Sequence, residues 1–252
     1  VAEEGGAVGG GEYEILPWIQ DVREAVKDGA VVLHDDFVPG AFLFPTQKTL
    51  PNAGRLQLAA GDIEQGFKDA DIVVEREYTT ATVHQGYIES HITTCRWDSD
   101  EHLTVWTSTQ GAFAIRDFLA SILNMQLSQI RVIPMEIGGG FGGKDVVYLD
   151  PLAALLAKKT GRPVKMAMTR AEVLKATGPS SGIYAKVKIG CKNDGTLVAA
   201  DLYMLFEAGA YPGGPIAPGA LCALTRYNIP TVVIDGYDVT LNNPNIKPSP
   251  AP

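Results

Sequence analysis

The feature that most constrains this chain is a glycine-rich run that reads Gly138-Gly139-Gly140-Phe141-Gly142-Gly143-Lys144-Asp145. Glycine loses conformational entropy on folding and fills no core, so such a cluster indicates a backbone that must pass where a Cβ atom would clash. This backbone is typical of a sharp strand-to-helix turn, or of a loop whose bare N–H groups approach a large ligand. A mobile loop is the alternative that the run alone leaves open.

The segments around the run predict a strand before it and a helix after it. Ile130–Pro134 is rich in β-forming residues, whereas Asp150-Pro151 places proline at the first helical position behind a capping aspartate. Residues 152–159 are rich in alanine and leucine and end in two lysines, which suits a helix C-terminus. Residues 112–124 also carry apolar side chains at helical spacing. The glycine run therefore follows a strand and precedes a helix.

Several further segments predict strands and hairpins. The two hairpins pair residues 93–97 with 102–107, and residues 183–191 with 196–206 around Asn193-Asp194-Gly195. Residues 72–80 predict one more strand, and residues 35–60 contain three prolines and little periodicity, which indicates loop or linker. We therefore predict an α+β fold with mixed sheets, long β-hairpins and packed helices.

Composition excludes several classes of function. The chain has 252 residues and a net charge of −8, which argues against a nucleic-acid partner. No apolar run reaches the roughly 20 residues that cross a bilayer, so we expect no membrane partner. Three widely spaced cysteines form no zinc or iron–sulfur pattern and predict reduced thiols in a cytoplasmic protein. The first residue is valine, and we expect the chain to be processed or a fragment.

Two nucleotide-binding motifs match the glycine run only in part. Gly138-x-Gly140-x-x-Gly143 fits the dinucleotide fingerprint, but the next predicted strand ends at Arg170 without the acid that would bind ribose. The same run fits a P-loop except that Asp145 stands where Ser or Thr should bind Mg²⁺. Phe141 suits a loop facing a bulky, partly aromatic cofactor better than it suits a phosphate cradle. Nucleotide binding remains an alternative at this point.

A second motif gives the glycine run a family resemblance. Thr107-Ser108-Thr109-Gln110-Gly111 lies upstream, and 31 residues separate Gln110 from Phe141. These motifs resemble the molybdenum-binding large subunit of the molybdenum hydroxylases, the xanthine dehydrogenase and aldehyde oxidase family. The likeness covers residues 61–252. Further similar stretches are residues 83–91, 161–165, 168–172 and 193–197.

The resemblance implies a molybdenum–molybdopterin cofactor, with the cytosine dinucleotide form of the pterin as one alternative. It implies hydroxylation of a heteroaromatic or aldehyde-type carbon of a small-molecule substrate with oxygen derived from water. Electrons would leave through iron–sulfur clusters and FAD on partner subunits or domains. On this interpretation residues 61–252 are the N-terminal part of the molybdopterin-binding domain, and residues 1–60 are the tail of a preceding domain and a linker.

The resemblance also assigns residue roles. Gln110 would hydrogen-bond an oxygen ligand of the metal, and no residue of the chain would ligate the metal directly. Asp145 occupies the place of a glutamate that binds the substrate ring in purine-oxidising members, and it is one methylene shorter; a charge favourable to the following helix is its alternative role. We expect Lys144 to be solvated or to face phosphate, and Glu89 and His91 to be structural. The residues that would approach the metal and pterin are Gly139, Gly140, Phe141 and Gly142.

The family's general base, a glutamate, is expected beyond the C-terminus, so no catalytic residue is assigned within this chain. The rest of the molybdenum subunit would supply it, and we expect the chain alone to be inactive. A truncated form and a natural split subunit both fit this expectation. A non-catalytic assembly module with a vestigial glycine loop is the competing interpretation.

Overall fold

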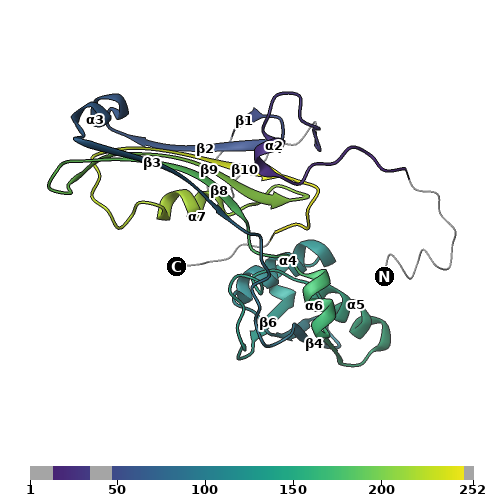
Figure 1. Ribbon diagram of the computed structural model, residues 1–252. Helices are drawn as coiled ribbons and strands as arrows, with labels where there is room; N and C mark the ends of the chain where they lie inside the picture. Colours follow the sequence, from purple (N-terminus) through teal and green to yellow (C-terminus); the bar gives the residue numbers. More distant parts are fainter. Residues whose placement is uncertain (1–13, 35–46, 247–252) are drawn as a thin grey trace.

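The computed structural model describes residues 14–34 and 47–246, which form two lobes (Figure 1). One lobe is built on a six-stranded sheet of order β1-β2-β10-β9-β8-β3, and the other on a four-stranded sheet of order β6-β5-β4-β7. The chain passes from the large lobe to the small one after β3 and returns after α6 (Figure 1). Mixed sheets with packed helices confirm the predicted α+β class.

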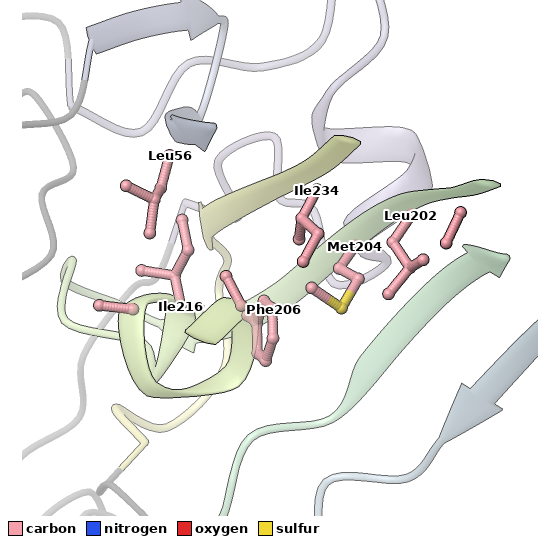
Figure 2. Packing of buried hydrophobic residues seen from close by; sticks show 9 residues of the cluster. Leu56, Leu202, Met204, Phe206, Ile216 and Ile234 are labelled. Atoms are coloured by element: carbon pink, nitrogen blue, oxygen red, sulfur yellow. The ribbon is translucent and has the colours of Figure 1, made fainter. Parts of the chain in front are cut away.

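The large sheet has a core on each face because alternate side chains of its strands point in opposite directions. Leu202, Met204 and Phe206 of β9 pack toward α7, and Figure 2 shows them together with Ile216 of that helix. Leu205, from the same strand, packs in the other core, which α2 covers. The elements of this lobe are β1 (Gln47–Leu50), β2 (Ala53–Ala60), β3 (Ile72–Thr80), β8 (Ile183–Cys191), β9 (Leu197–Gly209), β10 (Thr231–Thr240), α2 (Val22–Ala25), α3 (Ile63–Asp69) and α7 (Ile216–Cys222).

The small sheet carries its helices α4 and α5 on one face, where Val105, Ile115 and Ala154 share a core. Strands β5 and β6 are parallel neighbours joined through α4, and β4 pairs antiparallel with both β5 and β7. The elements are β4 (Ile92–Trp97), β5 (Leu103–Thr107), β6 (Ile130–Pro134), β7 (Val164–Ala167), α4 (Ala112–Leu123), the 3₁₀ helix η1 (Leu127–Gln129), α5 (Asp150–Thr160) and α6 (Arg170–Ala176).

Both predicted hairpins are confirmed, as are the strands at residues 72–80 and 130–134 and the helices at 112–124 and 152–159. The loop interpretation of residues 35–60 is wrong for residues 47–60, which form β1 and β2, while residues 35–46 lie outside the described residues. Strand β2 pairs with β10. Because the two strands are far apart in the sequence, no local turn signal predicts their pairing. For the same reason β10 was not predicted.

None of the helices within the described residues is long and apolar enough to span a bilayer.

Candidate functional site

The two motifs that the sequence singles out meet at one edge of the small sheet. The Thr-Ser-Thr-Gln motif continues from the end of β5, and the glycine loop continues from the end of its parallel neighbour β6. The backbone N–H of Met135 donates to the carbonyl of Thr107 at 3.0 Å and keeps the two segments side by side beyond the strands. Ligands of sheets with parallel strands bind where carboxyl ends of neighbouring strands meet, so this edge is the natural place for a site.

Gln110 is held against the glycine loop by both its backbone and its side chain. Its Oε1 accepts hydrogen bonds from the backbone N–H of Gly142 at 2.9 Å and of Lys144 at 3.3 Å. Its own backbone N–H donates to the carbonyl of Lys144 at 3.1 Å. Because two N–H donors face Oε1, the side-chain oxygen is directed at the loop and the Nε2 donor is left for another partner.

A side chain at Gly140 would disrupt the contact between the Gln110 side chain and the glycine loop. A Cβ atom there would lie 2.7 Å from Cδ of Gln110, which is closer than real Cβ contacts come. The loop therefore approaches the glutamine amide through bare backbone. This close approach is the physical reason for a glycine at position 140.

Phe141 sits in a left-handed backbone conformation with φ of 49°, between Gly139 at 92° and Gly142 at 81°. This conformation costs an L-residue about 1–2 kcal/mol. Phe141 is 59 % exposed as a residue, so burial in a core does not offset that cost. Strained backbone positions cluster at ligand sites, and the next residue, Gly142, donates its backbone N–H to the Gln110 amide oxygen.

The floor of the loop is the segment of residues 87–89. Tyr87 is buried, and Cβ atoms at Gly139 and Gly143 would lie 3.1 Å from its Cβ and 2.6 Å from its Cε1. A Cβ at Gly138 would lie 2.8 Å from Cβ of Glu89. The loop is therefore packed onto this segment along most of its length, and it is not a free surface excursion.

The structure contradicts the predicted role of Lys144 as a solvated or phosphate-facing cation. Its side chain is fully buried, and its Nζ forms an ion pair with Oε2 of Glu89 at 2.6 Å. Desolvation would raise the pKa of Glu89, but the hydrogen bonds from Lys144 and from the backbone of Gly138 together lower it. The apolar stem of lysine and its neighbour Tyr87 make burial possible, with Nζ 5.2 Å from the ring centroid.

A buried polar network lies beneath this floor. The Tyr87 hydroxyl contacts Nε2 of His91 at 2.7 Å, and the His91 ring packs edge-on against Tyr148 at 4.8 Å. Burial, reinforced by the positive charge of Lys144, lowers the pKa of His91 to about 4. Burial also raises the pKa of Tyr148 to about 12. Both groups are thus neutral near pH 7, and the expected structural role of His91 agrees with this environment. Sequence reasoning missed Tyr87 and Tyr148, and the only signal was the four-residue spacing of Tyr87 and His91.

Asp145 follows Lys144 and is half-buried. No hydrogen bond or ion pair joins its carboxylate to the parts of the chain that the structure describes, and burial raises its pKa. Helix α5 begins at Asp150, so Asp145 lies outside its first turn, where a dipole contribution would be felt. The helix-charge alternative for Asp145 therefore lacks support in the geometry.

The donor set of this edge fits a metal that brings its own organic ligand. Within residues 14–34 and 47–246, no three His, Cys, Asp or Glu side chains form a group that could hold a metal ion. What the edge offers is a neutral amide donor, bare backbone and an exposed aromatic ring. Groups of this kind can hydrogen-bond the ligands of a metal without ligating the metal themselves.

Comparison with known proteins decides the family. Residues 46–248 match the family model described as the molybdopterin cofactor-binding domain. The chain belongs to this molybdopterin cofactor-binding family. The resemblance in the sequence is thereby confirmed, and the family assignment favours this interpretation over the dinucleotide and P-loop alternatives.

Two bacterial proteins of described function are related in sequence to this molybdopterin-binding chain. It is 31 % identical to a probable xanthine dehydrogenase subunit of Bacillus subtilis over 92 % of this chain and 30 % of that protein. It is also 31 % identical to the nicotinate dehydrogenase large molybdopterin subunit of Eubacterium barkeri, over 92 % of this chain and 52 % of that protein. The chain thus spans about a third to a half of the length of these relatives.

Solved structures show the same fold. Quinoline 2-oxidoreductase from Pseudomonas putida superposes with a TM-score of 0.77 at 23 % identity, over 94 % of this chain and 30 % of that one. CO dehydrogenase from Oligotropha carboxidovorans gives 0.76 at 24 % identity, over 94 % of this chain and 31 % of that one.

Proposed function

We propose that this chain supplies one wall of the molybdenum–pterin site of an oxidoreductase that hydroxylates a heteroaromatic or aldehyde-type carbon with oxygen derived from water. The observation that carries the proposal is the Gln110 amide, whose oxygen is fixed by two loop N–H groups and whose Nε2 donor is left for a ligand. The family membership and the descriptions of the relatives support the same activity.

The bound cofactor would supply the redox chemistry, and the residues of this chain would orient it and shape the pocket. Gln110 would donate from Nε2 to an oxygen ligand of the metal. Phe141, with Gly139, Gly140 and Gly142, would bring bare backbone and one aromatic ring close to the metal and pterin, and the ring would exclude water from the reacting carbon.

Asp145 would bind the substrate. Its carboxylate has no partner among the described residues, and its raised pKa reflects burial without a compensating cation. A substrate N–H group would give this carboxylate the hydrogen bond that it lacks. Because aspartate is one methylene shorter than glutamate, we expect a substrate pose shifted from that of purine-oxidising members.

The remaining parts of the enzyme would come from elsewhere. We propose that the rest of the molybdenum subunit carries the general base, and that iron–sulfur clusters and FAD on partner subunits or domains accept the electrons in the cytoplasm. Relatives described as subunits of dehydrogenases support such an assembly. We also propose that the cofactor-binding region extends upstream of residue 61, since β2 pairs with β10 and the family match begins at residue 46.

Gln110→Ala in the complete enzyme tests the proposal. We expect turnover to fall by about 10²–10³-fold, the scale seen when one oriented donor is lost, with molybdenum content retained. Gln57→Ala is the matched control, because Gln57 is an exposed glutamine on β2 in the other lobe. Turnover equal to that of the control at full molybdenum content would contradict the assigned role of Gln110. A complete protein without molybdenum or turnover in any form would instead support the assembly-module alternative.

A further inference from the structure

The two ends of the glycine loop converge on one carboxylate oxygen. Oε2 of Glu89 accepts from the backbone N–H of Gly138 at 2.8 Å and from Nζ of Lys144 at 2.6 Å. The backbone N–H of Glu89 also donates to the carbonyl of Gly138 at 3.1 Å. Gly138 begins the loop and Lys144 ends it, so a single side chain fixes the span between them.

The burial of this pair argues for a role beyond stability. The Lys144 side chain is 0 % exposed and that of Glu89 is 26 % exposed, whereas the surface pair Lys158–Glu101 has exposures of 52 % and 65 % at a similar distance of 2.7 Å. Removing an ammonium group from water costs several kcal/mol, and apolar replacements of buried ion pairs are often as stable or more stable. A buried pair is therefore weak support for the fold, but it defines one geometry.

The residue that the pair anchors is also the residue that holds Gln110. The backbone N–H of Lys144 donates to Oε1 of Gln110, and its carbonyl accepts from the Gln110 backbone and from Oγ1 of Thr109 at 3.0 Å. Any shift of Lys144 therefore shifts the acceptor and donor groups that orient the glutamine amide. The chain of contacts runs from Glu89 through Lys144 to Gln110.

We propose that Glu89 and Lys144 are positioning residues that clamp both ends of the glycine loop and thereby set the orientation of the Gln110 amide. The importance of this orientation for the enzyme rests on the proposed function, but the clamp itself is a property of this chain. Breaking it should loosen the N–H groups of Gly142 and Lys144 that face Oε1 of Gln110.

The test is amide hydrogen exchange, followed by NMR on the 252-residue chain without cofactor. Lys144→Met leaves the Glu89 carboxylate without its cation, so this variant should melt at a lower temperature than wild type. Lys144→Met combined with Glu89→Leu replaces the pair with apolar groups, and its melting temperature should recover at least in part. In both variants we expect the backbone amides of residues 142 and 144 to exchange about 10-fold faster or more, because local opening sets their rate.

Two controls separate positioning from general stability. Glu101→Gln breaks the surface pair and should leave exchange at Gly142 unchanged, and amides of β9 should be unaffected in the double variant. The Gln110 side-chain amide resonances should move in the double variant. If its Gly142 exchange and Gln110 resonances match wild type, the clamp is contradicted, and this result holds even if Lys144→Met alone fails to fold. Because no cofactor or turnover enters this test, it fails independently of the Gln110→Ala experiment.

Discussion

The large sheet and the loop edge of the small sheet keep their shape by different means. The six-stranded sheet is held by apolar cores on both faces, in which side chains such as Phe206 and Leu205 contribute in proportion to the area that they bury. The loop edge of the small sheet is held by directional contacts among Gln110, Lys144 and Glu89. The cores of the large sheet should tolerate small shifts of their side chains but not the loss of side-chain volume. The hydrogen bonds and ion pair at the loop edge should tolerate almost no shift of the groups that form them.

The largest effect on stability should come from Phe206→Ala in the core of the large sheet. Phe206 is buried against α7, and a Cβ at Gly219 of that helix would lie 2.5 Å from Cζ of its ring. Loss of the ring should reduce the free energy of unfolding by about 3–5 kcal/mol, measured by denaturant titration. At denaturant concentrations where the variant is still folded, exchange at Gly142 should match wild type. Faster exchange at Gly142 under those conditions would show that the loop depends on the core of the large sheet.

Gly140→Ala should have the largest effect on the site. The added methyl group would displace the Gln110 side chain, so we expect turnover of the complete enzyme to fall at retained molybdenum content while the large lobe remains folded. Gly195→Ala is the control, because Gly195 has φ of 89° but nothing within 4 Å of a Cβ atom. That change should cost only the left-handed strain of about 1–2 kcal/mol and leave turnover unchanged. Equal turnover in both variants would contradict the tight approach at Gly140.

Asp238 in the large lobe and His91 in the small lobe should make the free energy of unfolding depend on pH in opposite directions. Burial raises the pKa of Asp238 in β10 to about 6, although the N–H groups of Gly213 and Gly214 oppose this shift. The folded state therefore binds the proton more tightly than the unfolded state, and Asp238 makes stability fall as pH rises from about 4 to about 6. His91 acts in the opposite sense, because its pKa of about 4 lies below its unfolded value, so stability is lost as pH falls from about 6.5 to about 4.

Single variants should separate the two opposing contributions to the pH dependence of stability. In Asp238→Asn, stability should rise with pH between about 4 and 6 more steeply than in wild type, since the His91 contribution is no longer offset. In His91→Gln the slope should change in the opposite direction. Thermal melting at half-unit pH intervals measures both slopes. Parallel curves for wild type and Asp238→Asn would show that Asp238 does not have a raised pKa in the folded state.

The sequence predicted the local part of this structure well. The helix at residues 112–124 and both hairpins follow from periodicity and from turns such as Asn193-Asp194-Gly195, which are encoded over short distances. It failed at β2 and β10, whose pairing joins residues that are far apart in the chain. Long-range pairing depends on two segments at once, and neither segment carries a signal for the other.

The sequence motifs single out Gln110 and the glycine loop as a candidate site, and the structure places them side by side. The contacts that support the loop could not be predicted. Glycines around Phe141 indicated close backbone approach, and the left-handed φ values are the geometry behind that pattern. The sequence predicts Lys144 to be solvated or to face phosphate, because lysines are mostly exposed and its partner Glu89 lies 55 residues away in the chain. The role of a buried ion pair cannot be read from either residue alone.

The central claim is that the Nε2 donor of Gln110 faces an oxygen ligand of molybdenum. Electron paramagnetic resonance of molybdenum in the partly reduced complete enzyme tests it directly, in Gln110→Ala against the Gln57→Ala control. We predict shifted g-values in Gln110→Ala at unchanged molybdenum content, because the hydrogen bond to the ligand is lost, and a wild-type spectrum in the control. Superimposable spectra for wild type and both variants would contradict the claim.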